Sequence, residues 1–279
     1  DLGIPHINTI ATVMKEGGEE SGVDVVVVDG KSQVSNWSRG IQSAIAAKAA
    51  AIVAIAVDLD AVKSQLEQAR KSGVAVVTGL STDANAPIPD EFKDILQGSV
   101  AEQYKRAGQV EAAWVIRESK GNANVLAIDA PGLAVSVPVK EGIQEVFDEH
   151  CPSCKVTWIH APTASWGSQL LNNVQTSLRA DPDIDYVIPE FDGMATSVVA
   201  AVHQAGAQNR VKVSTYNATG SILSLLKSGD VVGADSGTQG PWEAWALMDA
   251  AFRAILRQAA VPNYHIPARL FTSSNISSL

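Results

Sequence analysis

Basic residues are scarce in this sequence, and long apolar runs are missing from it. The 279 residues include 21 Lys and Arg against 30 Asp and Glu, which gives a formal net charge of -9 at pH 7. Nucleic-acid binding needs clustered Lys and Arg, so we expect no nucleic-acid partner. No apolar run approaches the roughly 20 residues of a membrane-spanning helix. The first residues, D-L-G-I-P-H, lack the basic region and apolar core of a signal peptide, so none is expected within this sequence.

Motifs for catalysis, cofactors and metals are also missing. G-K-S at residues 30–32 resembles the end of a phosphate-binding loop, but Val25 stands where that loop needs glycine. The zinc-protease motif H-E-x-x-H does not occur, and the five histidines are scattered at positions 6, 150, 160, 203 and 265. We therefore expect no catalytic residue, no cofactor and no metal site, and we do not expect an enzyme.

Cysteine is rare, and both cysteines lie together in C-P-S-C as Cys151 and Cys154. They follow the helical pattern E-G-I-Q-E-V-F-D-E-H and precede the predicted strand K-V-T-W-I-H, which places them in a loop rather than at the helix start typical of a redox motif. A local disulfide is favoured over a free pair, and if it forms the protein is extracytoplasmic. Zinc is disfavoured, because His150 and His160 lie outside the usual ligand spacing.

Short apolar, β-branched runs alternate with longer stretches at helical spacing, in a chain long enough for two lobes. Apolar strands that alternate with helices are typical of parallel sheets covered on both faces, which predicts an α/β fold. The widest irregular stretch, residues 83–94, divides the pattern into two halves. Strands are predicted at residues 23–29, 51–57, 74–80, 124–129, 155–160, 186–191, 211–217 and 231–235.

Several segments carry a family resemblance when they are taken in order. They are G-V-D-V-V-V-V-D-G, A-A-I-V-A-I-A-V-D-L-D-A-V and Q-A-R-K-S-G-V-A-V-V-T, then K-E-G-I-Q-E-V-F, D-P-D-I-D-Y-V-I-P-E-F-D-G-M-A, V-K-V-S-T-Y-N-A-T and L-K-S-G-D-V-V-G-A-D. In this order, and over almost the whole chain, they resemble the type I periplasmic binding proteins of sugar ABC transporters, in particular the ribose-binding-like group.

The resemblance implies two Rossmann-like lobes with parallel sheets, joined by a three-crossover hinge. With the helical pattern P-W-E-A-W-A-L-M-D after the eighth predicted strand, it places residues 1–99 and 238–268 in the N-terminal lobe. Residues 100–237 and 269–279 would form the C-terminal lobe. The family's first strand, central in the sheet of the N-terminal lobe, would either precede Asp1 or be replaced by another segment.

The resemblance also implies a function. A protein of this family captures a small neutral sugar or polyol in the interlobe cleft and delivers it to the permease subunits of an ABC importer. It would be bacterial and extracytoplasmic, either periplasmic or anchored at the cell surface, and a monomer is expected.

Candidate ligand-binding residues follow from matching the family's pocket positions to this sequence. At several of these positions the residue type differs from that of the family. His6 and Ile7 occupy the positions of two aromatic residues, and Leu80 and Ser81 occupy those of an Asp-Arg pair. The full candidate set is His6, Ser81, Trp166, Phe191, Asp192, Asn217, Asp235 and Gln239.

The chemistry of this set suits a neutral polyol. Aromatic rings stack on the apolar C–H faces of sugars, and amides and carboxylates pair with their hydroxyls. Simpler structural roles remain open for three residues. Trp166 could be a packed core ring, Asp192 could cap the helix that follows it, and His6 could be a solvated N-terminal residue.

Two other functions remain possible at this point. A sugar-responsive repressor of the lactose type shares the fold but carries a DNA-binding helix-turn-helix, which this sequence lacks. A sugar-modifying enzyme would need paired carboxylates or a metal, and Asp192 with Asp235 is the only pair that could be nominated. A turnover assay beside a binding assay tests for the enzyme, and the upstream sequence would decide on the repressor.

Overall fold

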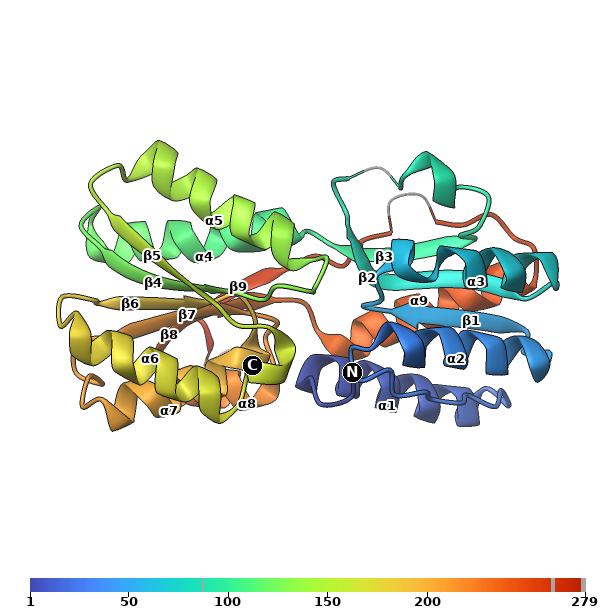
Figure 1. Cartoon of the computed structure of the whole chain (residues 1–279), viewed down its shortest axis with the longest axis horizontal. Coiled ribbons are helices and arrows are strands. Elements are labelled where there is room, and N and C mark those ends of the chain that lie inside the picture. The colour runs from blue at the N-terminus through green and yellow to red at the C-terminus, as the bar shows by residue number, and fades with distance from the viewer. Residues whose placement is uncertain (87, 262–263, 277–279) are drawn as a thin grey trace. The chain divides into compact units, whose positions relative to one another are not determined.

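The computed structural model describes residues 1–86, 88–261 and 264–276, and the chain forms two compact units (Figure 1). Unit 1 comprises Asp1–Gln103 and Gln239–Pro267, and unit 2 comprises Tyr104–Thr238 and Ala268–Leu279. Each unit has its own sheet with parallel strands and helices packed against it, which confirms the predicted α/β class. None of the helices in the described ranges is long and apolar enough to span a membrane.

Unit 1 is built on a three-stranded parallel sheet in the order β1-β2-β3. Helix α9 packs against all three strands, α3 packs against β2, and α1 packs against α9. Its helices are α1 (Pro5–Glu20), α2 (Val34–Ala46), α3 (Leu59–Lys71), the 3-10 turn η1 (Asp90–Phe92) and α9 (Gly240–Ile255), and its strands are β1 (Ala51–Ile55), β2 (Ala75–Asp83) and β3 (Gly98–Glu102).

Helix α3 illustrates how local sequence signals set the element boundaries. The Asp58 carboxylate accepts hydrogen bonds from the backbone N–H groups of Asp60 and Ala61, which would otherwise lack partners in the first turn. Arg70 and Lys71 lie in the last turn, where positive charge is favourable at the negative end of the helix dipole. The buried face of the helix, including Val62 and Leu66, packs into the core with Val76 of β2.

The strand predicted at residues 23–29 is wrong. This segment has no regular secondary structure, and Val26 and Val28 are 76% and 57% exposed. A strand needs a neighbour that completes its backbone hydrogen bonds. An apolar cavity of about 520 Å³ is lined both by residues 23–28 and by β1, so the segment does not reach the sheet edge that would supply those bonds.

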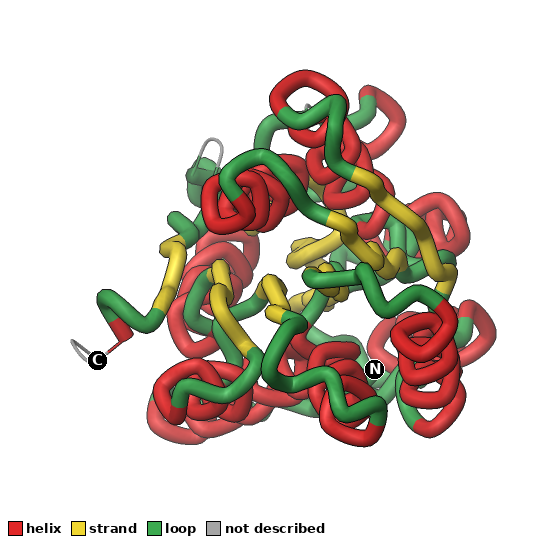
Figure 2. The backbone as a smooth tube through the Cα atoms, turned by 90° about the vertical axis from the view of Figure 1, so that its left-hand side faces the viewer, coloured by secondary structure: helices red, strands yellow, loops and turns green. Residues whose placement is uncertain are grey.

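Unit 2 is built on a six-stranded sheet in the order β5-β4-β6-β7-β8-β9, in which only β9 is antiparallel to its neighbour among the described strands. Figure 2 shows helices around these strands. The helices are α4 (Tyr104–Ser119), α5 (Ser136–His150), the 3-10 turn η2 (Thr163–Ser165), α6 (Ser168–Ala180), α7 (Asp192–Gln204) and α8 (Gly220–Ser228). The strands are β4 (Asn124–Asp129), β5 (Lys155–His160), β6 (Tyr186–Pro189), β7 (Lys212–Tyr216), β8 (Val232–Gly237) and β9 (Arg269–Thr272).

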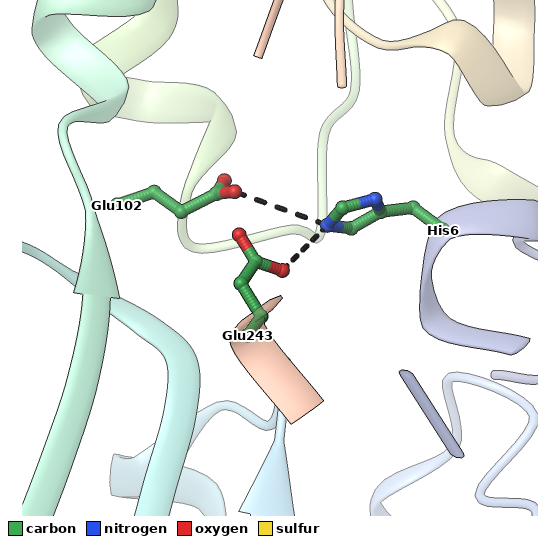
Figure 3. Close-up of side chains that lie close together, drawn as sticks. All are labelled: His6, Glu102 and Glu243. Atoms are coloured by element: carbon green, nitrogen blue, oxygen red, sulfur yellow. Dashed lines mark hydrogen bonds and ion pairs between the residues drawn. The ribbon is translucent and has the colours of Figure 1, made fainter. Parts of the chain in front are cut away.

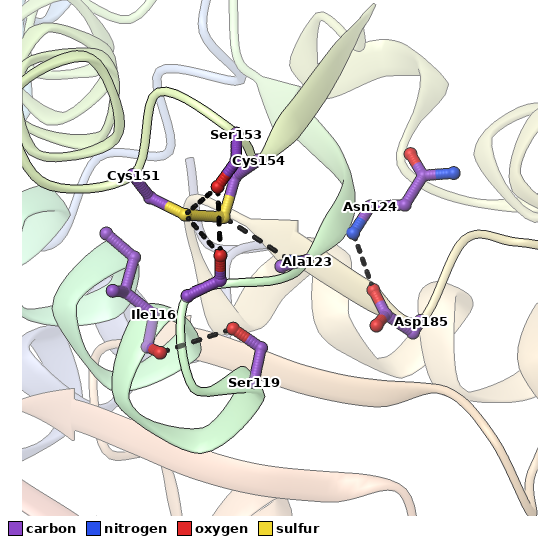
Figure 4. Close-up of a disulfide and its surroundings, with 9 residues drawn as sticks. Ile116, Ser119, Ala123, Asn124, Cys151, Ser153, Cys154 and Asp185 are labelled. Carbon is purple, nitrogen blue, oxygen red and sulfur yellow. Dashed lines mark hydrogen bonds between the residues drawn. A yellow bond between two sulfur atoms is a disulfide. The ribbon is translucent and has the colours of Figure 1, made fainter.

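The predicted disulfide between Cys151 and Cys154 is confirmed (Figure 4). Cys151 is the C-cap residue of α5, and the four-residue loop leads directly into β5. Ser153 within the loop donates a hydrogen bond from its Oγ to the backbone carbonyl of Gly121, at 3.1 Å. The loop is thereby tied to the turn before β4, far from the carboxyl ends of the strands.

Candidate functional site

Acidic, aromatic and amide side chains gather at the carboxyl ends of the parallel strands of unit 2. Strands β4 to β8 all run in one direction, so their carboxyl ends share one edge, which is where ligands bind in open α/β sheets. The side chains at or just after these ends are Asp129, His160, Glu190, Phe191, Asp192, Asn217 and Asp235.

An aromatic pair lies at this edge. The rings of Trp166 and Phe191 stack with their centroids 6.4 Å apart and their planes at 28°. The indole Nε1–H of Trp166 donates to the carbonyl of Ala161 at 2.8 Å, which fixes the ring orientation. A Cβ on Gly193 would lie 2.5 Å from the indole, so only glycine lets the ring rest on the first turn of α7. Both rings are buried, so Trp166 is a packed ring as well as a candidate platform for a ligand.

Two carboxylates hold the loop that follows β7. Asp192 Oδ2 accepts hydrogen bonds from the backbone N–H of Thr219 at 2.7 Å and from its hydroxyl at 2.6 Å. Asp235 Oδ1 accepts from the backbone N–H of Ala218 at 3.1 Å. Helix α7 begins at Asp192 itself, and Phe191 occupies the N-cap position. Burial, together with the nearby charge of Asp192, raises the pKa of Asp235 well above its ordinary value.

The backbone at Asn217 is strained. Its φ angle is 126°, in a region that favours glycine, and Ala218 follows at 52°. A Cβ on Gly237 would lie 2.5 Å from the carbonyl carbon of Asn217, so the ends of β7 and β8 approach closely here. Strained residues that the surrounding structure holds in place cluster at binding sites, which supports Asn217 as a candidate ligand residue.

Two further buried acids, Glu111 and Glu190, were not among the candidate ligand residues chosen from the sequence. Glu111, on α4, is fully buried, and neither of its carboxylate oxygens has a hydrogen-bond partner among the described residues. Burial and the charges of Glu190, Asp235 and Asp192 raise its pKa well above the ordinary value. Burial likewise raises the pKa of Glu190 to about 8. At neutral pH the Glu190 carboxyl group is therefore largely protonated.

The protonation of Glu190 should affect how the stability of the protein depends on pH. Its Oε2 accepts a hydrogen bond from Ser136 Oγ at 2.5 Å and another from the backbone N–H of Ala130 at 3.2 Å. A carboxyl group whose folded-state pKa is raised binds a proton in the folded protein that the unfolded chain has already lost. Stability is then complete below the unfolded pKa and falls as pH rises, by up to about 1.4 kcal/mol per pH unit until the folded pKa is reached.

We expect Glu190→Gln to flatten this fall in stability between about pH 5 and pH 8, because glutamine keeps the neutral form at every pH. Over that range the variant should gain on the wild type by a few kcal/mol, of order 3. Urea unfolding at several pH values measures the difference. Glu141→Gln, an exposed residue on α5, is the matched control and should follow the wild type. A Glu190→Gln curve as steep as that of the wild type would show that Glu190 does not carry the buried proton.

The candidates from unit 1 lie at the carboxyl edge of its own sheet. Ser81 Oγ accepts from the backbone N–H of Val57 at 3.1 Å and donates to the carbonyl of Gly79 at 3.2 Å, so it braces the ends of β1 and β2. Gln239 is exposed and occupies the N-cap position of α9. His6 is buried, so it is not a solvated terminal residue.

His6 contacts two acids that the sequence did not single out (Figure 3). Its Nε2 lies 2.7 Å from Glu243 Oε2 and 3.8 Å from Glu102 Oε1. Glu102 ends β3, a strand that was not predicted, and Glu243 lies in the first turn of α9, within a pattern that indicated only an amphipathic helix. The three residues come from distant parts of the sequence, so no local spacing could have indicated the cluster.

Two α/β units with parallel sheets, each with polar side chains gathered at its carboxyl edge, define the architecture of a ligand-binding protein. The chain belongs to the periplasmic binding protein domain family, whose model matches residues 1–258. The predicted family and fold are thereby confirmed.

Individual relatives share less than a quarter of their residues with this chain over the matched regions. The chain is 24% identical over 234 residues to a xylitol-binding protein of Mycolicibacterium smegmatis, a match that covers 81% of this chain. It is 22% identical over 207 residues to the ribose import binding protein of Bacillus subtilis, which covers 74% of this chain. The matched part spans 64% of the length of each of these relatives. Among solved structures, the Caulobacter myo-inositol binding protein, bound to myo-inositol, superposes with a TM-score of 0.86 at 23% identity, over 100% of this chain and 92% of that one.

Proposed function

We propose that this chain is the solute-binding component of an ABC importer and that it captures a small neutral sugar or polyol. The observation that carries the proposal is the carboxyl edge of the sheet in unit 2, where the Trp166–Phe191 pair lies next to the strained Asn217 and the carboxylates of Asp192 and Asp235. Apolar rings beside convergent hydrogen-bonding groups are the combination that polyhydroxylated ligands require.

Electrostatics favour a neutral ligand over an anionic one. Besides burial, the charges of Glu190, Asp235 and Asp192 raise the pKa of Glu111, and the charge of Asp192 raises the pKa of Asp235. Lys140 is paired with Asp129 at 2.5 Å, so its charge is already balanced. A phosphate or carboxylate on the ligand would add negative charge to an acidic region. Three relatives named for xylitol, ribose and myo-inositol agree with this chemistry, since all three compounds are uncharged polyols or sugars.

Binding without chemical change is part of the proposal. Asp192 and Asp235 are the pair that a sugar-modifying enzyme would need, but both hold the loop of residues 217–219 in place. A carboxylate committed to two hydrogen bonds from Thr219 is poorly available as a nucleophile or general base. The family of binding proteins to which the chain belongs supports the same conclusion.

The proposed place of action is outside the cytoplasm, with ABC permease subunits as partners. The family description and the disulfide between Cys151 and Cys154 both support this location, because disulfides persist in oxidising compartments.

A thermal-shift screen tests the proposed function. Five- and six-carbon neutral compounds (xylitol, ribitol, D-ribose and myo-inositol) are compared with the anions D-gluconate and ribose 5-phosphate. A ligand at 100 times its Kd adds about 2.7 kcal/mol of stability, which is a readily measured shift in Tm. We expect at least one neutral compound to stabilise the protein and neither anion to do so. Stabilisation by an anion alone, or by no compound of the neutral class, would contradict the proposal.

A further inference from the structure

Three side chains that can bind metals meet at the carboxyl edge of the sheet in unit 1. His6 lies in the first turn of α1, Glu102 is the last residue of β3, and Glu243 lies in the first turn of α9 (Figure 3). All three are buried: the side chains of His6, Glu102 and Glu243 are 6%, 1% and 0% exposed. Each comes from a different regular element, so the scaffold, and not a mobile loop, sets their positions.

The donor atoms have separations that suit a single ion. The His6 imidazole nitrogen lies 2.7 Å from the Glu243 oxygen and 3.8 Å from the Glu102 oxygen, and all three donor atoms lie within 4.8 Å of one another. In a tetrahedral zinc site with bonds of about 2.0 to 2.1 Å, neighbouring donors are about 3.4 Å apart. The two distances from His6 lie on either side of that spacing and differ from it by well under 1 Å.

Charge also favours a cation here. Two ionised carboxylates at a buried position would attract a divalent ion, and the attraction is stronger there than in water because the dielectric constant is lower. A divalent ion would neutralise both carboxylates and leave the imidazole uncharged, which is the form in which it binds metals.

We propose that His6, Glu102 and Glu243 bind a divalent transition-metal ion of the Zn²⁺ type. Imidazole nitrogen with carboxylate oxygens suits Zn²⁺ and its neighbours, whereas Ca²⁺ and Mg²⁺ prefer sites made of oxygen ligands alone. Three protein ligands leave one position of a tetrahedral ion for water. All three residues belong to unit 1 and none of them carries the proposed function, so this proposal does not depend on that function.

The test is equilibrium dialysis of the full, chelator-treated chain against Zn²⁺, with Mn²⁺ and Ca²⁺ in parallel and the bound metal measured by mass spectrometry. We expect one Zn²⁺ per chain with a Kd on the order of 1 μM or lower, weaker Mn²⁺ binding, and no Ca²⁺ binding at the same concentration. Glu102→Gln and Glu243→Gln should each weaken Zn²⁺ binding by at least about tenfold, because each removes a charged ligand.

His203→Gln is the matched control. His203 Nε2 also lies 2.8 Å from a carboxylate, that of Asp230, but this pair is far more exposed. The control should bind Zn²⁺ as the wild type does. The proposal is overturned if the wild type shows no saturable Zn²⁺ binding below about 100 μM, if His203→Gln loses the ion, or if the glutamate variants keep it. Circular dichroism checks that each variant is folded. If Glu243→Gln does not fold, the Zn²⁺ affinity of Glu102→Gln alone tests the proposal. A separate sugar titration of chelator-treated protein shows whether the proposed function stands without the metal.

Discussion

Gly108→Ala is expected to destabilise unit 2 by at least about 3 kcal/mol, although alanine favours helices more than glycine does. A Cβ at residue 108 of α4 would lie 2.0 Å from the carbonyl oxygen of Val139 and 3.0 Å from the backbone nitrogen of Ile143. The contact is reciprocal, because a Cβ on Gly142 of α5 would lie 2.1 Å from the carbonyl oxygen of Lys105. Backbone atoms cannot rotate away, so the two helices would have to separate and lose their packing.

Urea unfolding of the variant measures this effect. Gly220→Ala is the control, since residue 220 is also helical, as the first residue of α8, and a Cβ there would meet nothing within 4 Å. The control should be unchanged or more stable by up to about 1 kcal/mol. If Gly108→Ala unfolds at the same urea concentration as the wild type, the backbones of α4 and α5 do not approach closely enough at Gly108 to exclude a Cβ.

Trp166→Ala is expected to reduce affinity for the sugar or polyol by more than about tenfold. Loss of a stacking surface of roughly 100 Å² against the apolar face of the ligand costs about 2.5 kcal/mol at ~25 cal/mol per Å². The indole also packs on Phe191 and on the first turn of α7 at Gly193, so the variant should lose some stability too. Isothermal titration with the compound identified by thermal shift measures the affinity.

Trp158→Ala is the control that separates the two roles of the Trp166 ring, ligand stacking and core packing. Trp158 lies within β5, donates from Nε1 to Gln144 at 3.1 Å and lies beneath the Lys140 ammonium group, away from the aromatic pair. Its removal should lower stability while affinity stays at the wild-type value. If Trp166→Ala and Trp158→Ala bind the ligand equally well, Trp166 is a core ring and not part of the ligand site.

Much of the fold follows from the sequence because buried parallel strands are continuous apolar runs. The runs at residues 124–129 and 155–160 coincide with β4 and β5, and D-Y-V-I-P-E-F contains β6. Such strands are bounded by turn residues and separated by helices, so their local pattern is distinctive.

Other parts of the fold depend on neighbours that local patterns do not reveal. Residues 23–29 have an apolar, β-branched strand pattern but form no strand, because no other described segment completes a ladder with them. Strand β3 has the opposite property: G-S-V-A-E is a weak strand pattern, but β2 provides the backbone partners. Strand propensity reflects packing and pairing more than an intrinsic preference, which explains both errors.

The candidate sites likewise contain residues that local sequence patterns do not reveal. Phe191, Asp192 and Asn217 could be proposed from the sequence because they match pocket positions of the family that the sequence resembles. They also follow predicted strands, at the edge where ligands bind in α/β sheets. Glu111 could not, because it lies in the middle of α4 and its importance comes only from its burial next to other acids. Glu102 and Glu243 were missed for a related reason, since only the folded chain brings them to His6.

The central claim is that this protein binds a small neutral polyol or sugar and releases it unchanged. Isothermal titration of the full chain with the compound identified by thermal shift, followed by recovery and mass analysis of the compound, tests it most directly. A ligand of about ten heavy atoms at roughly -0.8 kcal/mol per atom gives about -8 kcal/mol, so we expect one ligand per chain, a Kd on the order of 1 μM and complete recovery of unaltered ligand. The absence of saturable binding, or the appearance of a product, would contradict the account.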